Sequence, residues 1–111
     1  MGKFLFRVAL FVCACLTAFS QGTTSRVVGT VQDSSGAVIP GAIVKLTNSG
    51  TNVTFTTTST GAGGYGFEAV QPGTYQLEVE AKGFKNFVSR DNLVTIGQPA
   101  TVNAKIGRAH V

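Results

Sequence analysis

The stretch from Val70 to Phe84 constrains the fold of this chain more than any other segment. It opens with Pro72-Gly73, where proline pre-sets φ at the first corner of a turn and glycine accepts the positive φ of the second. After this turn, apolar and polar residues alternate: Tyr75, Leu77, Val79 and Ala81 are interleaved with Gln76, Glu78, Glu80 and Lys82. A period of two buries one face of a strand and exposes the other. The stretch therefore predicts a half-buried antiparallel strand.

The composition agrees with a turn-rich β protein. The 111 residues are 43% hydrophobic and 13% charged and include 14 glycines. Threonine and valine, which favour strands, dominate the middle of the sequence. No stretch from Thr23 to Lys105 has the 3.6-residue apolar spacing of an amphipathic helix. The length leaves room for one small domain behind the N-terminal segment.

Further strands are expected on both sides of the first. They are Arg26–Asp33, Ala42–Asn48, Val53–Thr60, Tyr65–Val70, one or two strands between Phe87 and Ile96, and Thr101–Ile106. The residues assigned to structural turns are Gly36, Pro40, Gly41, Pro72, Gly73 and Gly83. Seven or eight short strands spaced by roughly ten residues are typical of an antiparallel β-sandwich. We expect a monomer whose core contains Val31, Val44, Leu46, Phe67, Tyr75, Leu77 and Val79.

The first twenty residues have the pattern of a secretory signal peptide. Lys3 and Arg7 give a positive start, an apolar run follows, and Ala18-Phe19-Ser20 is a small-x-small cleavage site. Cleavage after residue 20 would leave residues 21–25 as a short polar linker. The apolar run is shorter than the roughly 20 residues that span a bilayer, which does not favour a membrane anchor.

Both cysteines of the sequence lie in this N-terminal segment. The exported domain would therefore contain no disulfide, and its core would be held by packing alone. A lipoprotein signal with Cys15 as the modified residue is the alternative to a cleaved signal peptide, and the sequence does not decide between them.

Five motifs in a fixed order carry a resemblance to a known family. They are Gly29–Asp33, Gly36 with Ile39–Ala42, Gly64–Phe67, Pro72–Tyr75 and Ala81–Phe84. Together they resemble the carboxypeptidase regulatory-like domain, a transthyretin-like β-sandwich that is also called the carbohydrate-binding-like fold. The resemblance covers Arg26 to about Lys105, so residues 26–105 are expected to form this domain.

The sequence offers little for catalysis. The single histidine, His110, lies in the C-terminal tail, and the acidic residues Asp33, Glu68, Glu78, Glu80 and Asp91 show no paired or metal-ligand spacing. The family that the chain resembles is a module carried beside a peptidase and not the peptidase itself. We therefore expect no enzyme activity, no catalytic residue, no cofactor and no metal. For Asp33, an Asx-turn is favoured over a calcium ligand.

The resemblance also raises the question of a covalent crosslink. The related collagen-adhesin B-type domains join a lysine to an asparagine beside a buried acid. The position of that acid is occupied here by Val79, an apolar residue, so Lys45 and Asn103 are expected to remain unlinked.

Carbohydrate is the candidate ligand that the alternative name of the family implies. The chain has no tryptophan, and most of its aromatic residues are needed in so small a core. Phe84 and Phe87 are the aromatic residues least committed to the core, and they are the candidate ligand contacts. Nucleic acid is not favoured, because six basic and five acidic residues between Gln21 and Lys105 leave a net charge of only +1.

The last six residues, 106–111, read like an in-frame translation of a common sequencing adapter. We expect a non-native tail there and a natural chain that continues past Lys105. A signal peptide followed at once by one such domain resembles the front end of TonB-dependent outer-membrane receptors. The resemblance implies a soluble periplasmic interaction or spacer module that contacts a protein partner or the rest of a longer receptor chain. The alternative is a carbohydrate-binding or adhesive module of a secreted or cell-surface protein.

Overall fold

The computed structural model describes residues 23–109, so the predicted signal peptide and the end of the tail lie outside the described residues. These residues form eight strands: β1 (Ser25–Asp33), β2 (Ile43–Asn48), β3 (Thr54–Thr58), β4 (Gly64–Val70), β5 (Gly73–Glu80), β6 (Phe87–Val94), β7 (Ala100–Thr101) and β8 (Ala104–Ile106). No helix in this range is long and apolar enough to cross a membrane. The predicted all-β fold is confirmed.

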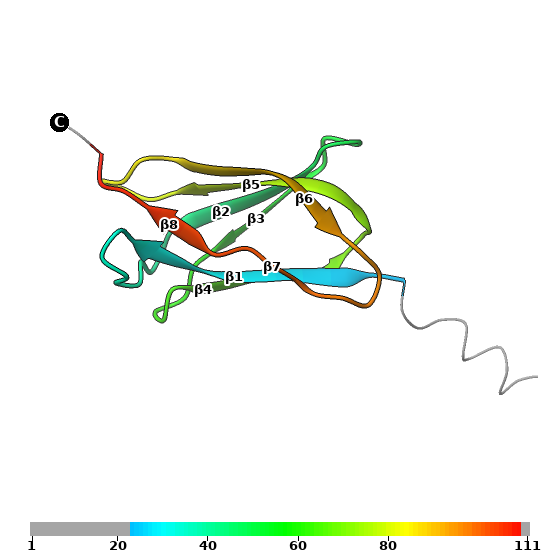
Figure 1. Cartoon of the computed structure of the whole chain (residues 1–111), viewed down its shortest axis with the longest axis horizontal. Helices are drawn as coiled ribbons and strands as arrows, with labels where there is room; N and C mark the ends of the chain where they lie inside the picture. The colour runs from blue at the N-terminus through cyan, green and yellow to red at the C-terminus, as the bar shows by residue number, and fades with distance from the viewer. Residues whose placement is uncertain (1–22, 110–111) are drawn as a thin grey trace, which may run out of the picture.

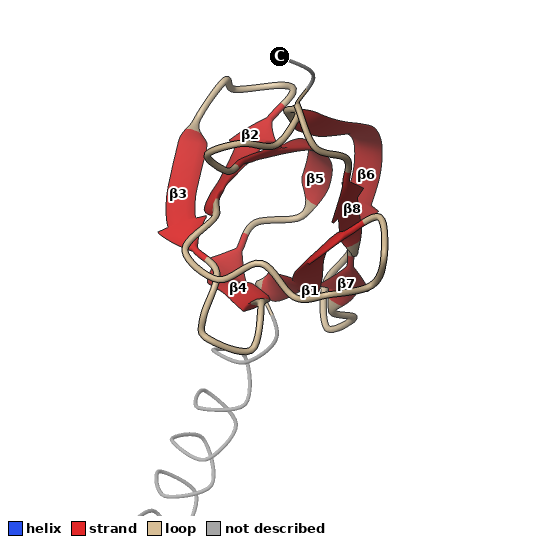
Figure 2. Ribbon diagram, turned by 90° about the vertical axis from the view of Figure 1, so that its left-hand side faces the viewer, coloured by secondary structure: helices blue, strands red, loops and turns tan. Residues whose placement is uncertain are grey.

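The strands form two sheets that face each other (Figure 1, Figure 2). The β2 sheet has the strand order β3-β2-β5-β6, and the β1 sheet has the order β4-β1-β7, with β8 also paired to β1. Most pairings are antiparallel, as predicted. However, β1 pairs in parallel with both β7 and β8, because the chain crosses from β6 to the other sheet before it runs alongside β1. The predicted β-sandwich is confirmed with this local change.

The core lies between the two sheets. In the β2 sheet, Leu77 is opposite Leu46 and Val79 is opposite Val44, and all four side chains are at most 1% exposed. The seven predicted core residues are all buried. The core also contains Val27, Ile39, Ala42, Tyr65, Val70, Val94, Ala104 and Ile106. The alternating pattern of β5 therefore points inward as its sequence predicts.

Some boundaries differ from the predicted ones. Ser25, expected in a linker, is the first residue of β1 and pairs with Val70 of β4. It is buried, and its hydroxyl donates to the carbonyl of Gln98 at 2.7 Å. The segment from Phe87 to Val94 is one strand. The expected last strand is divided into β7 and β8, and between them the amide of Thr30 donates to the side-chain oxygen of Asn103 at 3.1 Å instead of to a main-chain carbonyl.

The packed unit extends beyond Lys105. Ile106, the last residue of the expected strand Thr101–Ile106 and the first of the predicted tail, is only 2% exposed and pairs with Asp33 at the end of β8. The carbonyl of Gly107 accepts a hydrogen bond from the amide of Lys85 at 2.8 Å. A large apolar side chain at position 106 covers this corner of the core. The foreign origin of the tail stays a prediction.

Two β-bulges interrupt the ladders. The register between β1 and β4 shifts between Ser25 and Val27, and Ala69 has a φ of 54° there. The register between β5 and β6 shifts between Tyr75 and Leu77, opposite Asp91 with a φ of 59°. Bulges twist a strand and blunt the edge that it presents to solvent.

Candidate functional site

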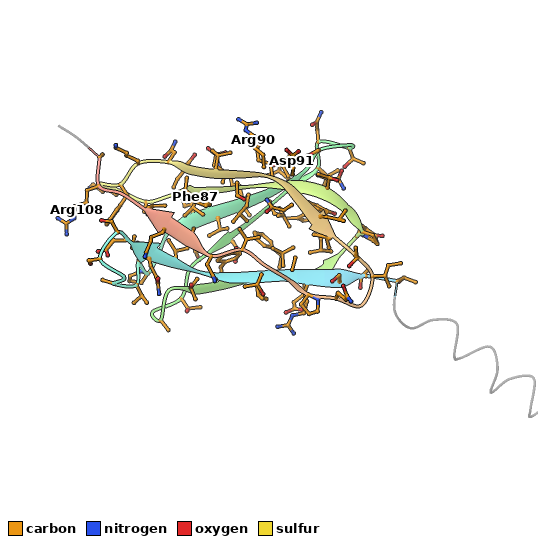
Figure 3. The ribbon with its side chains drawn as sticks, viewed as in Figure 1. Phe87, Arg90, Asp91 and Arg108 are labelled. Carbon is orange, nitrogen blue, oxygen red and sulfur yellow. The ribbon has the colours of Figure 1, made fainter. Side chains whose placement is uncertain are left out.

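The two predicted ligand contacts are not exposed aromatic platforms. Phe87 opens β6, lies on the side facing the other sheet (Figure 3) and packs partly against the core. Phe84 is also half-buried against the core and forms a backbone bridge with Arg108. A ring that stacks on a sugar needs a free face, which partial burial restricts. Their role in ligand binding stays a prediction.

The predicted turn residues take the expected positions with one exception. Gly36, Gly41 and Gly83 have φ values of 91°, 72° and 85°, and Pro40-Gly41 forms a turn before β2. Gly73 also has a positive φ, 157°, but it is already the first residue of β5. The chain bends at Pro72 instead.

Asp33 organises the turn after β1 as an Asx-turn. Its Oδ1 accepts hydrogen bonds from the amide and the hydroxyl of Ser35, at 2.9 and 2.6 Å, and from the amide of Ala37 at 3.0 Å. These bonds, with that of the Ser35 hydroxyl foremost, lower the pKa of the Asp33 carboxyl. One carboxylate oxygen is thus occupied by local donors. Within residues 23–109 there is no group of three or more His, Cys, Asp or Glu side chains that could hold a metal ion.

The acidic residues of β5 lie on the outer face of the β2 sheet. Glu80 Oε1 is 3.7 Å from Lys45 Nζ, an ion pair in which both side chains are more than a third exposed. Glu78 lies on the same face, opposite Lys45 in the ladder. Asn103, the other residue considered for a crosslink, accepts hydrogen bonds from Thr30 in the β1 sheet. The structure therefore engages Lys45 and Asn103 in separate local contacts.

Tyr65 is a buried titratable residue. Its hydroxyl donates to the carbonyl of Val102, and burial raises the pKa of the phenol above its ordinary value of 10. The hydrogen bond joins β4 to the segment between β7 and β8. Tyr65 is thus a structural residue that ties the β1 sheet together.

A shallow groove lies beside the start of β3. It has a volume of about 230 Å³ and is lined by Asn48, Thr51, Val53, Phe55, Gln71 and Tyr75. Phe55 is 44% exposed and Val53 is 50% exposed, so the groove has an apolar wall open to solvent. Sequence reasoning missed Phe55, although a single aromatic residue in an uncharged run of threonines marks it.

A second hollow of about 440 Å³ lies at the bulge between β1 and β4. Arg26 and Glu68 contribute charges of opposite sign, and Gly97 and Pro99 form the other wall. Two exposed charges of opposite sign do not select one class of ligand. The groove at Phe55 and the adjoining edge of β3 are therefore the better candidate for contact with another molecule.

The comparisons with known proteins identify the type of domain. A family model described as carboxypeptidase regulatory-like domain matches residues 26–107. A comparison with curated proteins found no match.

Solved structures share the fold at low sequence identity. The TIE protein of Bacillus anthracis is 17% identical with a TM-score of 0.66, over 78% of this chain and 17% of that chain. A protein from Bacteroides uniformis to which carbohydrate binding has been ascribed is 24% identical with a TM-score of 0.62, over 77% of this chain and 42% of that one. Catechol 1,2-dioxygenase from Acinetobacter radioresistens is 14% identical with a TM-score of 0.62, over 82% and 54%. The chain thus corresponds to a fraction of each of these proteins.

Proposed function

The chain belongs to the carboxypeptidase regulatory-like domain family, and we propose that it is a non-catalytic accessory domain at the N-terminus of a TonB-dependent outer-membrane receptor. In this role it is a periplasmic interaction or spacer module. The proposal is supported by the order of the segments, since the domain follows directly on a stretch with the pattern of a signal peptide.

The path of the chain through the domain supports the spacer role. Because β1 and β8 are parallel and Asp33 is opposite Ile106, the chain enters at Ser25 and leaves beside the far end of β1 (Figure 1). A strand of nine residues is roughly 26 Å long. A domain traversed from end to end separates the segments before and after it by about its own length.

The non-catalytic role agrees with the placement of the acidic side chains. Glu80 is paired with Lys45, and the carboxylate of Asp33 is held by its own turn. Both carboxylates are thus engaged by neighbouring groups of the domain itself.

The sequence of the complete locus tests the proposal. We expect hundreds of further residues, with strands of about ten residues of alternating hydrophobicity and aromatic girdles, after Lys105. A stop codon soon after Lys105, or a run of further sandwich repeats, would contradict the receptor role. The N-terminal residue of the exported protein is a second test, and we expect Gln21.

Carbohydrate binding is the second candidate function. It is favoured by the likeness to the Bacteroides uniformis protein and by the groove at Phe55, whose lining also includes Asn48 and Gln71. A pull-down with insoluble polysaccharides tests it. Loss of binding in Phe55→Ala would place the sugar in the groove, and loss in Phe87→Ala would place it at the contact predicted from the sequence. If the wild-type protein is retained on none of the polysaccharides, this function is contradicted.

A further inference from the structure

Strand β3 is the one described sheet edge that carries none of the usual protections against pairing. Its five residues, Thr54–Thr58, include no charge, no proline and no bulge. The other edges are blunted: β4 and β6 each contain a bulge, at Ala69 and Asp91, and β7 and β8 are only two and three residues long. Proteins avoid edge-to-edge pairing through short, bulged or charged edge strands. The β3 edge lacks all three.

The hydrogen-bonding groups of β3 alternate between its neighbour β2 and solvent. Val53 accepts from the amide of Asn48, and the amide of Ser59 donates to Ala42, both at 2.9 Å. Opposite residues in an antiparallel pair alternate between bonded and non-bonded positions. The odd-numbered residues therefore bond to β2. The amides and carbonyls of Thr54, Thr56 and Thr58 point away from β2, and no described strand is hydrogen-bonded to β3 on that side.

We propose that β3 pairs with β3 of a second copy of this chain, antiparallel and with Thr56 on the two-fold axis. In this register Thr54 of each copy is opposite Thr58 of the other, and Thr56 is opposite its own equivalent. Every outward amide and carbonyl of these three residues then bonds to an outward group of one of the same three residues in the other copy. An isologous contact of this kind needs a self-complementary surface, and the even spacing of the three threonines provides it.

The side chains in this register are compatible on both faces. On the outer face, threonine meets threonine three times, a favourable cross-strand pair, and no like charges meet. On the inner side, Phe55 of each copy is opposite Thr57 of the other and diagonal to the second Phe55. Phe55 is 44% exposed because β3 is an edge, and the partner strand would cover it. The two β2 sheets would become one continuous eight-stranded sheet.

This inference does not depend on the receptor context, and it differs from the monomer expected from the sequence. Two paired five-residue strands bury less surface than the roughly 1,200 Å² of a stable interface, so the dimer is expected to be weak. Sedimentation analysis of the purified protein up to about 1 mM is therefore the appropriate measurement, because association of this strength has a Kd near the millimolar range. A monomeric mass at every concentration in that range would overturn the proposal.

Substitutions at Thr56 distinguish this edge from any other interface. Thr56→Pro removes an outward amide but no bond to β2, so we expect a folded monomer, whereas Thr56→Val keeps the backbone and should still dimerise. A dimer that persists in Thr56→Pro would overturn the proposal.

A charge exchange keeps the test decisive if the proline variant does not fold. In Thr56→Lys and in Thr56→Glu, like charges face each other across the axis, and each variant alone should need about fivefold higher concentration to dimerise. An equimolar mixture of the two should restore dimers at the wild-type concentration. A mixture that behaves as the separate variants do would contradict the two-fold register.

Discussion

The phenolic hydroxyl of Tyr75 donates a hydrogen bond to the main-chain carbonyl of Gln71 at 2.7 Å. The bond spans the bend at Pro72 and closes the segment that leads from β4 into β5. The ring of Tyr75 is only 1% exposed, so the same side chain fills the core and fixes the connection between the two sheets. A tyrosine that bonds back to the main chain a few residues upstream has the same role at the corner of immunoglobulin domains.

Replacing Tyr75 by phenylalanine should destabilise the domain by about 1 to 3 kcal/mol, because the carbonyl of Gln71 loses its partner while the ring stays in place. Urea unfolding measures this free energy. Gln71→Ala is the matched control, since the bond uses the main chain of Gln71 and its side chain is exposed. Equal losses in the two variants would show that the hydroxyl does not stabilise the bend.

Gly29 is required by close packing in the β1 sheet. A Cβ atom at this position would lie 1.9 Å from the carbonyl oxygen of Val102 and 2.8 Å from Cε1 of Tyr65. Gly29→Ala should therefore cost at least about 3 kcal/mol, because the obstructing carbonyl belongs to the main chain. Gly66→Ala, on the neighbouring strand, is the control: its Cβ would meet Val28 at 3.7 Å, and the change should cost less than about 1 kcal/mol. Similar melting temperatures for both variants would contradict the close approach.

Local pattern explains what the sequence predicts correctly. The alternation from Tyr75 to Val79 depends only on neighbouring residues, and both the strand and its buried face are as predicted. The Asx-turn at Asp33 is likewise formed by residues within four positions of each other. The two-residue strand β7 pairs in parallel with β1, some seventy residues earlier, and no local pattern specifies that partner.

The candidate interaction site was not predictable for the same reason. Threonine-rich β3 looks like any half-buried strand in the sequence, and only the strand order makes it an edge. The bulge at Asp91 depends on a left-handed backbone at a residue other than glycine, which the sequence does not mark. The sequence marks Phe84 and Phe87 as the aromatics least committed to the core, and in the fold both are partly buried against it.

The turn at Asp33 should make stability depend on pH in acid. The Ser35 hydroxyl and main-chain amides lower the pKa of this carboxyl from its ordinary 3.8. Because the folded pKa lies below the unfolded one, the stabilisation is present above the unfolded pKa and is lost as the pH falls through the folded pKa. Asp33→Asn keeps an acceptor oxygen without the charge. Its urea midpoint should be below that of the wild type near neutral pH and equal to it in strong acid. A difference that is unchanged in acid would show that the charge contributes nothing.

Ser59 joins the end of β3 to the turn before β2. Its hydroxyl accepts from the amide of Ala42 at 2.8 Å and donates to the carbonyl of Ile39 at 2.7 Å, and the residue is 6% exposed. Both bonds are buried, so neither main-chain group can turn to water if the hydroxyl is removed. A buried polar group that loses its partner lowers the free energy of unfolding by about 1 to 3 kcal/mol.

Ser59→Ala should therefore destabilise the domain by about 2 kcal/mol or more, since it removes the partner of two groups at once. Thr58→Ala is the control, because Thr58 is the exposed neighbour on the same strand and its side chain points to solvent. Thermal unfolding of both variants gives the comparison. If the two lose the same stability, the amide of Ala42 and the carbonyl of Ile39 find other partners and the hydroxyl does not hold the turn to β3. If only Ser59→Ala is destabilised, the serine fixes the end of the strand whose outward edge we propose as the contact with a second copy.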